Sequence, residues 1–228
     1  MCGRYAVASS NREIEERFQC DVGSLELTPR YNVAPTQESL AIVTGANGER
    51  QGQMMRWGLV PHWAKDLSIG ARFINARAET AEETAAFRVA FRKRRCLVVA
   101  TGFYEWLREG KAKPPFYVML KAKGPFAFAG LWELWRSPEG KWVRSFTILT
   151  TEANPLMRPI HDRMPVILTP ETEALWLDPL SEDPARLSKV LVPFAAEEMH
   201  FHEVSSIVNS WKVDSSACAE PIAAGPGG

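Results

Sequence analysis

The chain has 228 residues, with 27 lysines and arginines, 27 aspartates and glutamates, and 46% hydrophobic residues. A chain of this size can bury a sizeable core in one domain, and eight tryptophans with a 24% charged fraction exclude a disordered or low-complexity protein. Zero formal net charge excludes a uniformly basic nucleic-acid coat but not a local basic groove, because binding depends on how charge is distributed.

Apolar runs and cysteines indicate the compartment. The longest apolar runs, such as 126–132, are too short to cross a bilayer, and the N-terminal residues lack the apolar region of a signal peptide. The four cysteines, at positions 2, 20, 96 and 218, form no C-x-x-C pair and no metal-ligand spacing. We therefore expect a cytoplasmic protein with free thiols and no membrane partner.

Hydrophobic periodicity and capping signals predict the elements. In chain order they are a strand over 3–8, a helix from 10 to about 20, a loop over 28–36, strands near 39–44 and 51–57, a helix over 80–94, strands over 96–101, 103–107, 115–121, 126–134 and 142–150, helices from 170 and over 184–191, and a strand near 199–204. The helix starts rest on Ser10 with Glu13, Thr80 with Glu83, and Thr169 before Pro170. The basic run 91–95 is expected on an exposed helix face.

Strands and helices do not alternate as βαβ units, which favours an α+β fold over a doubly wound one. No linker-like stretch divides the chain. We therefore predict one domain over residues 1–214 and a disordered tail over 215–228.

Cys2 is the most unusual placement of a reactive residue. Loss of Met1, common when residue 2 is small, leaves an α-amine with a pKa near ~7.8 beside a thiol near ~8.5. Such a 1,2-aminothiol attacks an aldehyde through nitrogen, and its sulfur then closes a thiazolidine ring; N-terminal nucleophiles also serve amide hydrolases. The alternative is a frayed chain end, and the strand predicted from residue 3 argues against it.

Glu105 is the odd residue of an apolar segment. On a strand, Phe103, Glu105 and Leu107 share one face, while Tyr104 and Trp106 share the other. Burial without a cation would raise the pKa of Glu105 and leave a carboxylic acid able to transfer protons near pH 7. The alternative is an edge strand with Glu105 in solvent.

The histidines offer one candidate proton shuttle. His161 lies between two prolines, which excludes the middle of a helix, and it is followed by Asp162 and Arg163. A solvated loop histidine is the alternative. His200 and His202 share one face of a strand, but two ligands do not make a zinc site, so we expect no metal and no cofactor.

Asn75 and Arg77 lie on one side of an extended segment, where an amide suits a polar ligand group and a guanidinium suits a phosphate. A turn asparagine and a surface ion pair are the alternative. Arginines and tryptophans are interleaved around the candidates, as in a groove for single-stranded nucleic acid, although most tryptophans are expected in the core. They are Arg4, Arg77 and Arg163 with Trp57, Trp63 and Trp106.

Sequence blocks over nearly the whole chain resemble the SRAP family, the SOS-response-associated peptidase domain that processes abasic DNA sites. They are MCGRY at 1–5, RYNVAP at 30–35, RWGLVPHW at 56–63, INARAET at 74–80, GFYEW at 102–106, ILTTEAN at 148–154, IHDRMPVIL at 160–168 and VNSWKVDS at 208–215. The resemblance implies a single compact α+β domain with a β-rich, barrel-like core and flanking helices.

The resemblance also implies a function in the DNA damage response. The protein would bind single-stranded DNA, or a junction of single and double strands, and crosslink to the ring-opened aldehyde of an abasic site. Cys2 would be the nucleophile, Asn75 would orient its amine and the sugar, and Glu105 and His161 would transfer protons. Arg4, Arg77 and Arg163 would contact phosphates, and Trp106 and Trp63 would stack on bases.

Two other functions remain open. The family name suggests a cysteine-type peptidase or autopeptidase, and a weak lyase activity is expected because a Schiff base at C1′ acidifies C2′. A non-covalent single-strand binding module would need the groove but not Cys2. We expect a monomer that joins the nucleoid when it binds DNA.

Overall fold

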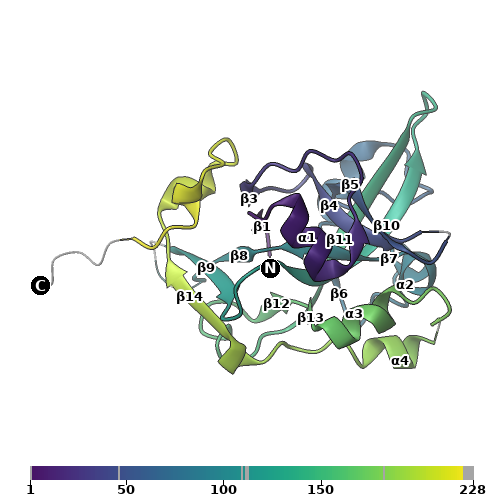
Figure 1. Ribbon diagram of the computed structural model, residues 1–228. Coiled ribbons are helices and arrows are strands. Elements are labelled where there is room, and N and C mark those ends of the chain that lie inside the picture. Colours follow the sequence, from purple (N-terminus) through teal and green to yellow (C-terminus); the bar gives the residue numbers. More distant parts are fainter. Residues whose placement is uncertain (1, 46, 109, 111–112, 182, 223–228) are drawn as a thin grey trace, which may run out of the picture.

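The computed structural model describes residues 2–45, 47–108, 110, 113–181 and 183–222 (Figure 1). The strands, in chain order, are β1 (Arg4–Val7), β2 (Cys20–Asp21), β3 (Arg30–Val33), β4 (Glu38–Thr44), β5 (Arg50–Trp57), β6 (Asn75–Arg77), β7 (Arg95–Ala100), β8 (Gly102–Trp106), β9 (Pro115–Leu120), β10 (Phe126–Arg136), β11 (Trp142–Glu152), β12 (Arg163–Pro165), β13 (Ile167–Leu168) and β14 (Met199–Glu203). The α-helices are α1 (Asn11–Phe18), α2 (Arg88–Lys93), α3 (Pro170–Leu177) and α4 (Pro184–Ser188), and 3-10 helices cover Leu67–Arg72, Ala196–Glu198, Ser206–Asn209 and Ser216–Cys218.

A closed circuit of strands forms the centre of the molecule. β11, β10, β7, β4 and β5 pair in that order, and β5 then pairs in parallel with β11, where Arg56 faces Ser145 and Trp57 faces Phe146. The circuit has no free edge at this closure, so it is a small barrel whose interior is filled by side chains. The predicted α+β domain with a barrel-like core is confirmed.

A second sheet has the strand order β14-β9-β8-β1-β3 and places β1 between two strands that follow it in the chain. Its inner face packs on the main core, to which Tyr5 and Phe103 belong. Its outer face carries Ala6 and Tyr104 into a smaller cluster with the C-terminal residues. Glycine is required at position 102, because a Cβ there would lie 2.3 Å from the ring of Tyr117.

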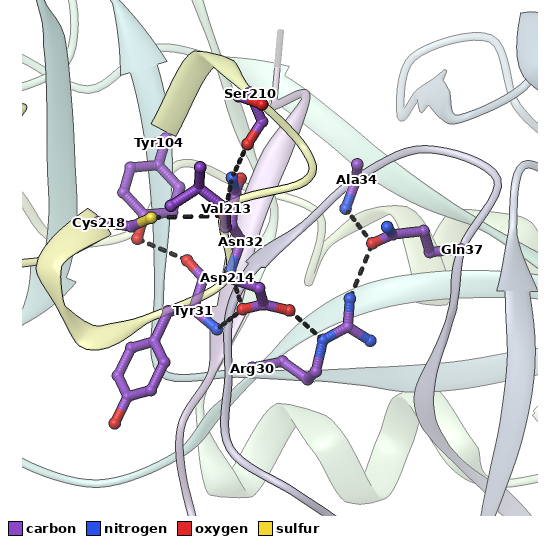
Figure 2. A network of polar contacts seen from close by, with 10 residues as sticks. All are labelled: Arg30, Tyr31, Asn32, Ala34, Gln37, Tyr104, Ser210, Val213, Asp214 and Cys218. Atoms are coloured by element: carbon purple, nitrogen blue, oxygen red, sulfur yellow. Dashed lines mark hydrogen bonds and ion pairs between the residues drawn. The ribbon is translucent and has the colours of Figure 1, made fainter. Parts of the chain in front are cut away.

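The C-terminal segment, residues 204–219, is held on this outer face by a polar network (Figure 2). The Asn32 side chain is fully buried, and its Nδ2 donates to the carbonyls of Val208 (3.1 Å), Ser210 (3.0 Å) and Val213 (2.8 Å). The Asp214 carboxylate accepts from the main-chain N–H of Asn32 at 3.0 Å and pairs with the Arg30 guanidinium. The Asn32 side chain of β3 therefore fixes the backbone of residues 208–213, which lie near the other end of the chain.

The predicted elements differ from the structure in three places. The stretch expected as a loop over 28–36 contains strand β3, which pairs with β1 and is stabilised by Asp214. Most of the helix expected over 80–94 is a series of turns, and only Arg88–Lys93 is α-helical. The Thr84 hydroxyl donates to the carbonyl of Thr80 there, a local bond that competes with a regular helix.

The third difference concerns the chain end. The tail expected from 215 is structured over 215–222, where Ser216–Cys218 forms a 3-10 helix and the side chain of Cys218 is buried. Its thiol lies 3.5 Å from the carbonyl oxygen of Val213 (Figure 2). Residues 223–228 lie outside the described residues.

Arg95 was expected on an exposed helix face and is buried instead. Its guanidinium donates to main-chain carbonyls at the ends of two helices, including Phe91 of α2 and Trp176 of α3. A cation at helix C-termini is stabilised by the carbonyl groups that have no partner within the helix.

The other helix starts are as predicted. Ser10 and Glu13 form a complete capping box at α1, and Thr169 caps α3 with Pro170 in its first turn. Among the described residues, no helix is long and apolar enough to cross a membrane.

Candidate active site

Cys2 and Asn75 are in contact where the inner face of the second sheet packs against the barrel. Cys2 lies two residues before the start of β1, and its side chain is fully buried. Asn75 begins β6, which runs parallel to β11 with Asn75 facing Ile148. The Asn75 Nδ2 donates to the carbonyl oxygen of Cys2 at 2.8 Å, so one hydrogen bond fixes the backbone of the candidate nucleophile.

The other amide atom of Asn75 is available to a ligand. Its Oδ1 is buried and has no hydrogen-bond partner among the residues that the structure describes. A buried acceptor without a donor is costly, and a bound group that donates to it removes that cost. Asn75 therefore combines a fixed donor with an acceptor that suits an amine or a hydroxyl group.

The Cys2 thiol is a neutral group in this environment. Burial raises its pKa, and the nearby charge of Glu105 raises it further. The Sγ lies 3.7 Å from the carbonyl oxygen of Arg4, within reach of a weak S–H donor. The sulfur must therefore lose its proton to a neighbouring group before it can attack as a thiolate.

Glu105 is buried on the inner face of β8 and only 3% of it is exposed, which excludes the solvent-exposed alternative considered above. Burial raises the pKa of its carboxyl. A carboxyl group with a raised pKa can both take up and release a proton near neutral pH. Its charge also acts on the Cys2 thiol, whose pKa it raises further.

His161 lies between β11 and β12 and is almost fully buried, with 5% exposed. The main-chain N–H of Arg163 points at its Nδ1 from 2.9 Å, and its Nε2 lies 2.7 Å from the Nη2 of Arg108. Burial lowers the pKa of His161 to about 4, so the ring is neutral at physiological pH. The alternative considered above, a solvated loop histidine, is therefore excluded: His161 is a buried, neutral imidazole.

Arg108 was missed by the sequence analysis. It follows β8, and its Nη1 pairs with the Asp162 carboxylate at 2.9 Å while its Nη2 reaches His161. Its charge also acts on Glu105, lowering the pKa of that carboxyl against the larger effect of burial. Arg108 therefore connects Glu105 and His161. The one signal for it was a basic residue shortly after Glu105.

The three arginines predicted to contact phosphates lie in different environments. Arg4 on β1 is half-buried, its Nη1 donates to the carbonyl of Gly3, and burial lowers its pKa. Arg77 on β6 is exposed beside Thr150 of β11. Arg163 on β12 forms a bidentate pair with the Glu79 carboxylate at 2.7 and 2.8 Å, so a phosphate that binds Arg163 must displace Glu79.

The two candidate stacking residues also differ. Trp106 is half-buried on the outer face of β8, and its indole N–H donates to the Asn209 side chain at 2.8 Å. Trp63 is 50% exposed in the loop after β5. The neighbouring Ala64 carbonyl accepts from the indole of Trp135, which ties this loop to β10.

His200 and His202 lie on β14, away from these residues in the strand order. The Nε2 of His202 lies 2.8 Å from the carbonyl oxygen of Ala219. Within the described part of the chain, no group of three or more histidine, cysteine, aspartate or glutamate side chains is arranged to hold a metal ion.

Comparison with known proteins gives consistent results. The family described as SOS response associated peptidase (SRAP) matches residues 1–211. "Abasic site processing protein YoqW" of Bacillus subtilis is 47% identical over 223 residues, covering 96% of this chain and 99% of the relative. "Abasic site processing protein HMCES" of Xenopus tropicalis is 31% identical over 232 residues, covering 89% and 69%. A crystal structure of a Bacteroides thetaiotaomicron protein covers 97% of this chain and is itself covered fully, with a TM-score of 0.89 and 28% identity.

Proposed function

This chain belongs to the SOS response associated peptidase (SRAP) family, and on that premise we propose that it processes abasic sites in DNA as part of the DNA damage response. We propose further that it traps the abasic sugar in single-stranded DNA covalently through Cys2. The names of the relatives support the first statement. The second rests on the arrangement of the site.

The observation that carries the proposal is the placement of Cys2 between an amide and a carboxyl group. Asn75 fixes its carbonyl oxygen, and the Glu105 carboxyl is close enough for its charge to act on the thiol. A residue at a frayed end would have neither contact. A nucleophile needs both a fixed position and a proton acceptor, and these two side chains supply them.

The chemistry balances with these groups. The α-amine of Cys2 adds to the aldehyde carbon C1′ of the ring-opened sugar, and loss of one water gives a Schiff base. The Sγ then adds to C1′ while its proton moves to the ring nitrogen, which closes the thiazolidine. Glu105 and His161 are the candidates for carrying protons between sulfur, nitrogen and the departing water.

The reaction requires that Cys2 carry the free α-amine, and therefore that Met1 be removed. Met1 lies outside the described residues. In the folded protein Cys2 is buried and its backbone is held by Asn75, so the sugar must enter a site that is already shaped around this residue.

DNA recognition is assigned to the groups around the site. We propose that Arg4, Arg77 and Arg163 bind phosphates, that Trp106 and Trp63 stack on bases, and that the protein acts as a monomer in the cytoplasm on single strands or strand junctions. Arg77 on β6 and Arg163 on β12 lie on either side of β11, an arrangement that suits a backbone crossing that strand.

A peptidase is the second candidate, because the family description contains that word. A cysteine peptidase needs a thiolate with a lowered pKa, whereas burial raises the pKa of the Cys2 thiol. The environment therefore favours slow chemistry led by the amine. A weak lyase activity remains compatible with a Schiff base at C1′.

The decisive experiment uses single-stranded DNA with one abasic site. Protein whose intact mass shows loss of Met1 is mixed with this DNA, and heat-stable shifted bands are measured on a denaturing gel. We expect a shifted band for the native protein and none for Cys2→Ser. Cys20→Ser is the matched control, because Cys20 is another free cysteine outside the site, and it should crosslink normally.

Three outcomes are informative. No shifted band from the demethionylated native protein would refute covalent trapping. A heat-stable band that persists in Cys2→Ser would show that the thiol, and therefore the thiazolidine, is not needed for crosslinking. Full binding of abasic DNA without any covalent band would support the non-covalent binding module instead.

A further inference from the structure

The ring of His161 is approached by two hydrogen-bond donors at once. The main-chain N–H of Arg163 points at Nδ1 from 2.9 Å, and the Arg108 Nη2 lies 2.7 Å from Nε2. A guanidinium can only donate, and so can a main-chain N–H. Both nitrogens are therefore presented with donors.

A neutral imidazole cannot accept both bonds, because one of its nitrogens carries the proton. If Arg108 is accepted at Nε2, the proton is on Nδ1, where the Asp162 Oδ1 at 3.0 Å is an acceptor for it. If Arg163 is accepted at Nδ1, the proton is on Nε2, which is then a donor and repels Arg108. Two tautomers of one ring thus correspond to two positions of one arginine.

Arg108 is the partner that can move. The Arg163 N–H belongs to β12, which is held in the sheet against Glu152 of β11. The Arg108 side chain is 53% exposed, and the side chain of its partner Asp162 is 66% exposed. An exposed ion pair is worth little and exchanges readily with another anion, so a phosphate can take the guanidinium from Asp162 and His161.

We propose that Arg108 is a positioning residue that sets the tautomer of His161. With Arg108 on Nε2 the ring is held as the Nδ1–H form; when a DNA phosphate engages the guanidinium, the ring proton moves to Nε2 and this nitrogen becomes a hydrogen-bond donor. The number of protons on the ring does not change, because the proton leaves Nδ1 for Asp162 or water and one returns at Nε2.

This device couples DNA binding to hydrogen-bond donation. Without DNA, Nε2 is occupied by Arg108 and cannot donate a hydrogen bond. With the strand in place, Nε2–H can donate a hydrogen bond to the oxygen that leaves C1′ as water during Schiff-base formation, while the ring keeps its proton. The role of the DNA phosphate rests on the proposed function, whereas the tautomer of the free protein does not.

The test is nuclear magnetic resonance of protein labelled with ¹⁵N at histidine, since long-range ¹H–¹⁵N spectra distinguish the two neutral tautomers. His161 is assigned with His161→Gln. We expect the Nδ1–H form in the free native protein and in Arg108→Lys, which keeps a donor, and the Nε2–H form in Arg108→Gln. An intact single-stranded oligonucleotide without an abasic site should move the native protein to the Nε2–H form.

The control is Arg12→Gln, which removes another exposed arginine from an ion pair, that with Glu16 on α1, and should leave the tautomer unchanged. A dispersed amide spectrum of Arg108→Gln shows that the variant is folded. An Nε2–H ring in the free native protein, or an unchanged tautomer in folded Arg108→Gln, overturns the proposal. A native tautomer that does not respond to the oligonucleotide overturns its DNA-dependent part.

The outcomes separate this inference from the proposed function. Crosslinking to abasic DNA by the native protein without a tautomer change leaves covalent trapping intact and refutes the role of Arg108. A tautomer change on binding intact DNA, with no covalent band on abasic DNA, supports Arg108 and refutes trapping.

Discussion

The two faces of β8 are buried by different kinds of contact. On the inner face, Phe103 and Glu105 are buried against the main core, where aromatic and aliphatic side chains pack closely. On the outer face, Tyr104 and Trp106 pack in a small cluster. The C-terminal segment, residues 204–219, covers this cluster and is held in place by the hydrogen bonds of Asn32. Five consecutive residues of one strand therefore face two environments.

The difference shows how a site with unusual proton chemistry can be stable. The inner face holds a carboxyl group whose ionisation is opposed by burial, which costs stability but gives the group a useful pKa. The outer face contributes stability through hydrogen bonds, chiefly those of the Asn32 Nδ2 and the Asp214 carboxylate. The comparison predicts that changes on the inner face alter reactivity, and that changes on the outer face alter stability.

Glu105→Gln should have the largest effect. Loss of a proton-transfer group lowers rates by about 1,000-fold, and this should appear as slower crosslinking to abasic DNA in a time course. Glu133→Gln is the matched control, because Glu133 on β10 is equally buried but pairs with Arg94, the residue after α2. Equal crosslinking rates for Glu105→Gln and the native protein would contradict the assignment.

The same variant should change the pH dependence of stability. Burial raises the pKa of Glu105 above its ordinary value of 4.5. Between pH 4.5 and the raised pKa, the folded state therefore binds more protons than the unfolded state. The contribution of Glu105 to stability is then largest at low pH and falls as pH rises. Glu105→Gln removes this slope, and urea unfolding from pH 4 to 8 should show the variant gaining on the native protein.

Asn32→Ala tests the outer face. It removes an amide group whose two N–H bonds are shared among three main-chain carbonyls. At about 1 kcal/mol for each N–H, we expect a loss of roughly 2 kcal/mol in the free energy of unfolding. Crosslinking by the folded fraction should stay near the native rate. Asn11→Ala, which breaks one bond to the Leu25 carbonyl, is the control and should cost about 1 kcal/mol. Equal losses for both variants would contradict the role of the network.

Asn209→Ala has the smallest expected effect and also acts on the outer face, through Trp106. Its Oδ1 accepts from the indole N–H of Trp106, so its loss should cost about 1 kcal/mol of stability. If Trp106 stacks on a base, affinity for single-stranded DNA, measured by fluorescence anisotropy, should fall as well. Asn209→Asp keeps an acceptor and should retain both properties; weakened binding in that variant would show that the indole bond is not the cause.

The inner face of β8 was predictable because its signal is local. Alternation over a few residues places Phe103 and Glu105 on one side, and the structure confirms that both are buried. The helices at 11 and 170 were predictable for the same reason, from the capping box of Ser10 with Glu13 and from Thr169 before Pro170. The same kind of signal at Thr80 and Glu83 did not start a regular helix. The catalytic assignments for Cys2, Asn75 and His161 remain proposals, although the structure gives each a defined partner.

The outer face was not predictable because its contacts are distant in the sequence. β3 is four residues long and is stabilised by β1 and by Asp214, which lies near the other end of the chain. The same contacts order residues that composition alone assigned to a disordered tail. Arg108 was missed because its contacts are with His161 and Asp162, which lie more than 50 residues away in the sequence and come close to it only in the folded chain.

The position of β1 between β3 and β8 has a consequence for synthesis. Cys2 leaves the ribosome early, but its surroundings come from β6, β8 and the segment before β12. At roughly 5–20 residues per second, the last of these follows it by about 10–30 s. During that interval the N-terminus is unfolded and accessible, and after it Cys2 is buried. An enzyme that removes Met1 would therefore act most readily in this interval, whereas self-cleavage, the alternative left open above, would take place after folding.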